Sequence, residues 1–153
     1  MYLTNYLGML RQAELDLADG FRRMANGHGK EPDIYFLCLT LAKQCDKHAE
    51  RLDPFAERYG EVVPEDHDRL GTKILAEGSR GGGLGLMRDL QDLYVMASFC
   101  DNTWTMIGQA AQGTRDPELL EVVEACEAET ATQMKWIETR MKQAAPQALI
   151  VAS

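Results

Sequence analysis

Apolar residues recur along four segments of the chain at alternating steps of three and four, which is the spacing of one stripe on an α-helix. The segments cover residues 3–26, 33–59, 85–112 and 117–145. Four stripes of this kind can bury their apolar faces against one another in a single core. The pattern therefore predicts an all-α protein built from four long helices.

Glycine and proline mark the ends of these segments. Residues 26–29 include two glycines that can adopt the left-handed backbone found at helix ends, and Pro32 suits the first turn of the next helix. Pro117 opens the fourth segment directly after an aspartate that can cap it. Pro146 is expected to end that helix and to leave residues 146–153 as a tail.

The three connections between the helices are predicted to be short, long and short. The long one, residues 60–84, ends in a glycine-rich stretch that is best explained as a hinge. A link of this length can run along a bundle, so that the second and third helices lie parallel. We therefore expect a single domain over residues 1–153, an antiparallel four-helix bundle with a long crossover. The apolar content of 45% is ample for one core.

The net charge of the chain indicates which classes of partner are not expected. The net charge is −8, and the basic residues are scattered among acidic ones. Binding to nucleic acid or to an anionic membrane needs a basic surface, so neither is an expected partner. Residues 1–10 lack the basic start and apolar run of a signal peptide, and no stretch approaches the length of a membrane span. We expect a cytoplasmic protein whose cysteines are reduced.

A polar residue interrupts each apolar stripe near its middle. The four residues are Glu14, His48, Asp101 and Glu127. Because a buried, unpaired carboxylate is costly, three acids around one histidine would be explained by a shared cation. The alternative is a polar layer without metal, in which Glu14 and His48 form a hydrogen-bonded pair and the other two acids bond aromatic side chains or trapped water.

The choice of Glu127 depends on the register of the fourth helix. Glu124 and Glu129 lie close by, and Glu127 is preferred as the inward acid because it shares a stripe with Val123 and Thr130. A different register would place another acid in the core.

Three cysteines lie at about the same height as these polar residues. Cys45 precedes His48 by three positions, and Cys100 and Cys126 immediately precede the third and fourth acids. Free cysteine usually packs as a small apolar residue, but a thiolate can also bind a soft metal or take part in redox chemistry. The sequence leaves these three roles open.

The topology and the spacing of these residues resemble the ferritin-like superfamily, the helical bundles that include ferritins, bacterioferritins and rubrerythrins. In that family the first and third helices each give a carboxylate, the second and fourth each give a Glu-x-x-His pair, and two iron or manganese ions lie between them. By this resemblance the two carboxylates fall on Glu14 and Asp101. The second-helix pair falls on Cys45 and His48, with a thiol in place of the glutamate.

The fourth-helix pair falls on Glu127 and Thr130, with a hydroxyl in place of the histidine. By the same resemblance, Glu14, His48 and Glu127 leave one metal position a carboxylate–histidine–carboxylate set, which suits iron, manganese or zinc. The second position would keep poor ligands. We predict one ion per chain, and a thiolate at Cys45 would shift the preference toward zinc or copper.

The last residues of the chain form an apolar segment. Residues 148–152 are apolar and follow a helix breaker, so they are expected to lie against their own bundle or a second copy, and a homodimer is preferred.

His28 and His67 fall in polar loops, where solvated side chains are expected.

Three functional hypotheses from different classes follow. The first is a ferritin-like metalloprotein that carries out iron-dependent oxidation, of the ferroxidase or oxidative-stress type, with a reduced metal site. The second is a carrier or sensor of a soft metal, which uses the thiols together with His48. The third is a bundle without metal that acts as a structural or partner-binding protein. Iron-dependent oxygen consumption, loss of titratable thiols on metal binding, and indifference to chelators separate the three.

Overall fold

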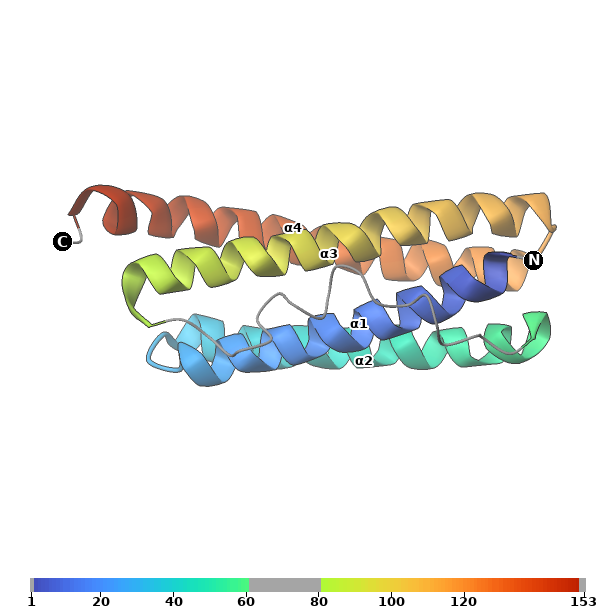
Figure 1. The fold of residues 1–153 in the computed structure, drawn as a ribbon, viewed down its shortest axis with the longest axis horizontal. Helices are drawn as coiled ribbons and strands as arrows, with labels where there is room; N and C mark the ends of the chain where they lie inside the picture. The colour runs from blue at the N-terminus through green and yellow to red at the C-terminus, as the bar shows by residue number, and fades with distance from the viewer. Residues whose placement is uncertain (1, 61–80, 152–153) are drawn as a thin grey trace.

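The computed structural model describes residues 2–60 and 81–151, and these form four long α-helices with no strand among them (Figure 1). The helices are α1 (Tyr2–Gly27), α2 (Pro32–Tyr59), α3 (Gly82–Gly113) and α4 (Pro117–Pro146), and a short π-helical turn, η2 (Gln147–Val151), follows α4. The predicted all-α class is confirmed, and the helix bounds lie within three residues of the predicted ones. Residues 61–80 of the predicted crossover lie outside the described residues.

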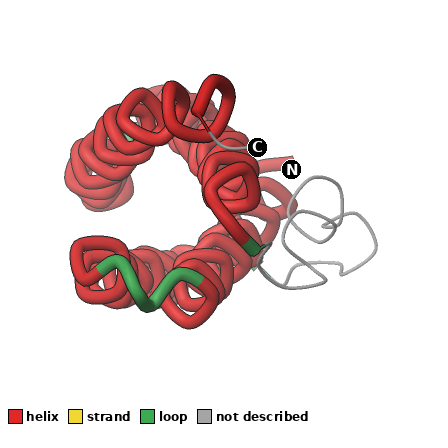
Figure 2. The backbone as a smooth tube through the Cα atoms, turned by 90° about the vertical axis from the view of Figure 1, so that its left-hand side faces the viewer, coloured by secondary structure: helices red, strands yellow, loops and turns green. Residues whose placement is uncertain are grey.

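Two helix hairpins lie side by side. Short turns join α1 to α2 and α3 to α4, and the helices of each hairpin pack closely along their length. The hairpins meet mainly where α1 packs against α3, whereas few residues of α2 and α4 approach one another. In the end-on view the backbones of the two pairs accordingly draw together on one side and diverge on the other (Figure 2). Long side chains bridge the diverging side.

The apolar stripe of α1 is buried along its whole length, as predicted. On α3 and α4, however, the buried stripes differ from the predicted ones. The buried stripe of α3 passes through Cys100 rather than Asp101, and that of α4 through Cys126 rather than Glu127. Each acid directly follows a thiol, so two neighbouring stripes were available in each helix. Burial of a neutral thiol is cheap and burial of a carboxylate is costly, which selects the stripe with the thiol.

Asp116 ties the start of α4 to the end of α2. Its carboxylate accepts hydrogen bonds from the backbone N–H of Leu119 at 3.1 Å, from Arg58 Nη1 at 2.7 Å and from the Tyr59 hydroxyl at 2.6 Å. The predicted helix cap is therefore confirmed, with two additional donors. Burial would raise the pKa of Asp116, but the hydrogen bonds from Tyr59, Arg58 and Leu119 together lower it to about 2.

His28 ties the turn between α1 and α2 to α3 at the opposite end. Its Nε2 lies 2.8 Å from Oδ2 of Asp89, and both side chains are buried. The expectation of a solvated His28 is therefore wrong, because a buried acid from another helix reaches the turn. His67 lies outside the described part of the chain.

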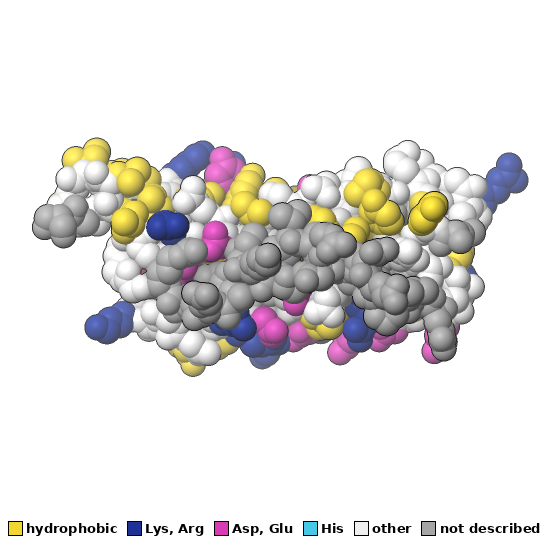
Figure 3. Space-filling model, viewed as in Figure 1, with side chains coloured by type: hydrophobic (Ala, Val, Ile, Leu, Met, Phe, Trp, Pro, Cys, Tyr) yellow, Lys and Arg dark blue, Asp and Glu magenta, His cyan; other side chains and the backbone are white. Residues whose placement is uncertain are grey.

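The C-terminal turn η2 leaves three aliphatic side chains exposed. Ala148 is buried, but Leu149, Ile150 and Val151 are mainly exposed. Figure 3 shows hydrophobic side chains gathered at the end of the molecule where the chain finishes. None of the helices in the described ranges is long and apolar enough to cross a membrane.

Candidate functional site

A buried ion pair lies at mid-height between α1 and α2. Glu14 and His48 are both fully buried, and Nδ1 of His48 lies 3.3 Å from Oε1 of Glu14. The two stripes were predicted to bring these residues into the core, and the structure places them there together. An acid and an imidazole in contact within a core form a coupled pair, in which each group stabilises the charge of the other.

Trp104 of α3 completes the surroundings of Glu14. Its indole Nε1–H donates a 2.8 Å hydrogen bond to Oε1 of Glu14, and its ring meets the His48 ring edge to face, with 6.1 Å between centroids. Oε1 thus faces two partners. Oε2 of Glu14 is buried and has no hydrogen-bond partner. A buried acceptor left in this state costs about 1–3 kcal/mol.

Glu129 supplies the contact from α4. Its Oε1 lies 3.1 Å from Nε2 of His48, so the imidazole is held between two carboxylates. The Glu129 side chain is 43% exposed, whereas that of His48 is 1% exposed. The chain of contacts Trp104, Glu14, His48 and Glu129 therefore joins four helices and leads from the core to the surface between α2 and α4.

The other two predicted acids lie apart from this chain of contacts. Asp101 and Glu127 are both half-buried, and Glu127 accepts a hydrogen bond from the exposed hydroxyl of Thr105. Burial raises the pKa of Asp101, and the nearby charge of Glu127 raises it further. Within the described ranges, no hydrogen bond or ion pair joins either acid to Glu14 or His48. The structure thus divides the four predicted residues into two separate pairs.

Sequence reasoning missed Glu129 as the partner of His48 because it assigned the inward stripe of α4 to Glu127. Once Cys126 and Thr130 face the core, a long side chain at position 129 reaches His48 from the edge of that stripe. The sequence did contain a signal for the correct stripe, because burial of the Cys126 thiol costs less free energy than burial of the adjacent Glu127 carboxylate.

His48 sits in surroundings that favour its charged form. Burial alone would lower its pKa, but the hydrogen bond and the charge of Glu14, joined by those of Glu129, raise the pKa above its ordinary value. A protonated imidazole can donate from both ring nitrogens at once. The contacts on its two nitrogens are those of an imidazolium between two carboxylates.

Three buried thiols surround the same region and stay protonated. Burial, followed by the charge of Glu14, raises the pKa of Cys45 and Cys100 well above the ordinary value. Burial also raises the pKa of Cys126 to about 12. Nε2 of Gln133 lies 3.7 Å from Sγ of Cys45 and is placed to donate a weak hydrogen bond to it, while the thiol is a weak donor beside the Glu14 carboxylate. Within the described ranges, the thiols and His48 do not surround a common point, and the soft-metal hypothesis stays a prediction.

The carboxylate, imidazole and thiol groups of this region do not converge on a single point. Within residues 2–60 and 81–151, no three His, Cys, Asp or Glu side chains surround a common point as a metal site requires. The two carboxylates approach opposite nitrogens of His48, which explains this result. One of the two carboxylates would have to turn for the three side chains to meet at one point.

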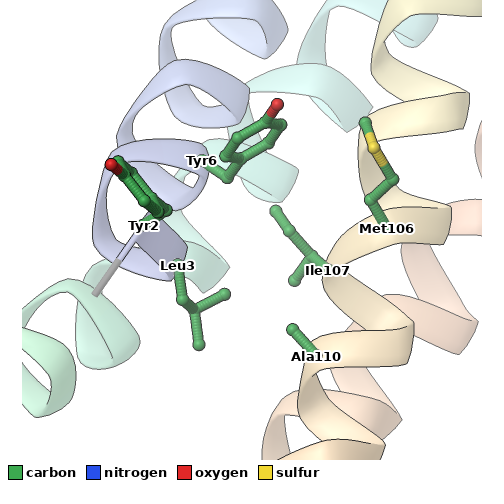
Figure 4. Close-up of a pocket in the computed structure, with 6 residues that line it drawn as sticks. All are labelled: Tyr2, Leu3, Tyr6, Met106, Ile107 and Ala110. Atoms are coloured by element: carbon green, nitrogen blue, oxygen red, sulfur yellow. The ribbon is translucent and has the colours of Figure 1, made fainter.

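An apolar hollow of about 250 Å³ lies between the beginning of α1 and the second half of α3 (Figure 4). Its lining consists of Tyr2, Leu3, Tyr6, Met106, Ile107 and Ala110. The Tyr6 ring lies opposite Met106 across this hollow (Figure 4). The lining has no acid, histidine or thiol, so the hollow does not share the chemistry of the His48 region.

No protein-family model matches this chain, and no curated protein is significantly similar to it. The functional assignment therefore depends on the geometry around His48.

Proposed function

We propose that this protein is a ferritin-like, antiparallel four-helix bundle that binds one divalent cation at Glu14, His48 and Glu129. The observation that carries the proposal is Oε2 of Glu14, a buried carboxylate oxygen that no nitrogen or oxygen donor of the described residues reaches, with only the weak donor of the Cys45 thiol beside this carboxylate. Such an oxygen is costly unless a cation or a donor reaches it. The course of the chain in Figure 1, where α2 and α3 run in the same direction, supports the bundle topology.

The set of donors favours one ion of intermediate hardness. Two carboxylates and one imidazole from three helices suit iron, manganese or zinc. Nε2 of His48 and Oε1 of Glu129 lie 3.1 Å apart, close to the roughly 3 Å between neighbouring ligand atoms around an ion with bonds of about 2.1 Å. Glu14 contacts the other ring nitrogen, Nδ1, so its side chain has to turn for Oε2 to reach the same ion.

A second ion lacks suitable ligands. Burial raises the pKa of the Cys45 thiol well above its ordinary value, and the Thr130 hydroxyl donates to the backbone oxygen of Cys126 at 2.8 Å. Asp101 lies with Glu127 in the other pair of acids. One ion per chain is therefore the proposed stoichiometry. An iron ion held at this site would supply the capacity to activate oxygen or peroxide.

Matched substitutions on α4 test the proposed ligand set. Glu129→Gln is expected to weaken Mn²⁺ or Zn²⁺ binding at least about tenfold, because it removes a carboxylate that contacts His48. Glu127→Gln changes the same charge two residues away and is expected to leave affinity nearly unchanged. Isothermal titration of both variants and of the wild type measures the difference. Equal affinities for the two variants, or a loss confined to Glu127→Gln, would refute the assignment of Glu129.

The second candidate is a bundle without metal that has a structural or partner-binding role. The observation in its favour is that a protonated His48 already donates to both carboxylates and partly balances their charges. A protein of this kind would bind none of the tested ions, and chelators would not change its thermal unfolding.

We also propose a cytoplasmic homodimer. Buried thiols without disulfides suit a reducing compartment. The three exposed aliphatic side chains of η2 suit contact with a second copy.

Light scattering after size exclusion tests the dimer. The wild type is expected at about twice the chain mass of 17.1 kDa, and Leu149→Ser combined with Ile150→Ser is expected to give monomers, because it removes the apolar contact surface. Val95→Ser, at an exposed apolar position on α3, serves as the control. A monomeric wild type would exclude this proposal.

A further inference from the structure

The apolar hollow between α1 and α3 is bordered by exposed side chains (Figure 4). Of its lining residues, Leu3 and Ile107 are buried, whereas Tyr2, Tyr6 and Met106 are partly or largely exposed. A closed apolar cavity of about 150 Å³ can take up a benzene molecule, so a hollow of about 250 Å³ has room for one or two aliphatic side chains. With no charged group in its lining, the hollow suits such side chains better than a polar ligand.

A second apolar surface lies at the opposite end of α3 (Figure 1). Here η2 packs against α3 and α4 and leaves Leu149, Ile150 and Val151 exposed. Leu84, which is exposed near the start of α3, and Met106, which lines the hollow, are 22 residues apart. This separation corresponds to about six helical turns and about 33 Å. Leu84 and Met106 therefore face the same side of α3, and η2 of one copy does not reach its own hollow.

The extent of these two surfaces favours a symmetric arrangement. Each copy exposes three apolar side chains at the hollow, those of Tyr2, Tyr6 and Met106, and three aliphatic side chains in η2. Stable dimers bury roughly 1,200 Å² or more in total. A single contact between one η2 and one hollow engages only half of these side chains, whereas a symmetric pair of contacts engages all of them.

Resting on the proposed homodimer, we infer that Leu149 and Ile150 of each copy fill the hollow of the other copy, with the two bundles antiparallel. The distance from η2 to the hollow is the same in both copies, so a two-fold axis that forms one contact also forms the other. Such a dimer is closed, because neither an η2 nor a hollow is left free to add a third copy. The occupant of the hollow is thus the C-terminal turn of a second copy of this chain.

Disulfide cross-linking of the full chain in solution tests this contact. The four native cysteines are buried and do not compete with introduced ones. Ile150→Cys and Met106→Cys are prepared separately, incubated together and oxidised with glutathione disulfide. The mixture is expected to give cross-linked dimers, and neither variant alone should, because like positions lie about 33 Å apart in the antiparallel pair. Ile150→Cys mixed with Thr40→Cys, at an exposed position of α2, is the control and should give none.

A substitution that fills the hollow tests the same contact from the other copy. Ala110→Trp adds an indole to the lining and is expected to raise the Kd of the dimer at least about tenfold, because the indole occupies the space that Ile150 would take. Thr40→Trp adds the same ring on α2 and should leave the Kd unchanged. Sedimentation equilibrium measures the Kd, and circular dichroism checks that both variants are folded.

Each failure has a separate meaning. Cross-linking of Ile150→Cys with itself, or a wild-type dimer whose mixture of variants does not cross-link, would overturn docking into the hollow and leave the homodimer intact. A folded Ala110→Trp with an unchanged Kd would do the same. The double variant Ile150→Cys with Met106→Cys is expected to stop at two cross-linked chains, and a ladder of longer products would overturn the antiparallel arrangement. A monomeric wild type would overturn the homodimer and the docking with it.

Discussion

Replacement of His48 by alanine is expected to lower the free energy of unfolding by about 3–5 kcal/mol, since it leaves Glu14 as an uncompensated charge in the core. The loss combines a missing partner for the carboxylate with a cavity beside Trp104. Urea unfolding monitored by circular dichroism measures it. Glu14→Gln removes the buried charge and keeps an acceptor for the indole of Trp104.

A double-mutant cycle separates the charge effect from the cavity effect. In the Glu14→Gln background, His48→Ala no longer leaves a buried carboxylate without a partner. The free energy of unfolding of the double variant is therefore expected to fall by about 1–3 kcal/mol less than the sum of the two single losses. Leu52→Ala, which opens a cavity one turn away without a charge, should add to Glu14→Gln nearly independently. A cycle for His48 that is additive within about 0.5 kcal/mol would contradict a coupled pair.

The pH dependence of the His48 effect has a defined sign. The pKa of His48 is raised in the folded protein, so its stabilising contribution is present below the unfolded value of about 6.5. It is lost as the pH rises through the folded value. The stability gap between the wild type and His48→Ala should therefore shrink as the pH rises above 6.5, whereas the gap for Leu52→Ala should not follow this trend.

Asp116→Ala is expected to lower the free energy of unfolding by about 2–3 kcal/mol at neutral pH, because the start of α4 loses its cap and Arg58 and Tyr59 lose their acceptor. Asp116→Asn keeps a side-chain oxygen for the backbone N–H of Leu119 and removes the charge. It is expected to lose less than the alanine variant. Chemical unfolding at several pH values compares the three proteins.

The pH dependence at Asp116 runs in the opposite direction to that at His48. Its pKa is lowered to about 2 in the folded protein, compared with about 3.9 unfolded. The contribution of the charge is therefore present above pH 4 and is lost as the pH falls toward 2. The gap between the wild type and Asp116→Asn should narrow over this interval. A constant gap from pH 6 to pH 2 would show that the charge of Asp116 adds no stability.

The four helices could be predicted from the sequence because their apolar stripes repeat at helical spacing and their ends carry glycine, proline and a capping aspartate. The inward positions of Glu14 and His48 followed for the same reason, since each stands alone between apolar neighbours in its stripe. Their role as metal ligands stays a prediction.

The partners of Glu14 and His48 on α3 and α4 could not be obtained from the stripes. Position 101 follows Cys100, and position 127 follows Cys126, so either member of each pair could face the core at the resolution of a repeat pattern. When α3 and α4 turn their thiols toward the core, Asp101 and Glu127 lie at the half-buried edge of each helix. The reach of Glu129 to His48 depends on the separation of α2 and α4, which results from tertiary packing rather than from a local pattern.

The metal content of the purified protein tests the central claim most directly. The protein would be prepared without chelator, loaded anaerobically with ferrous iron, desalted, and analysed by elemental mass spectrometry beside His48→Ala and the control Glu127→Gln. We predict about one iron per chain in the wild type and in Glu127→Gln, and none in His48→Ala. Wild-type protein that retains no metal, or that retains two ions per chain, would contradict the single site formed by Glu14, His48 and Glu129.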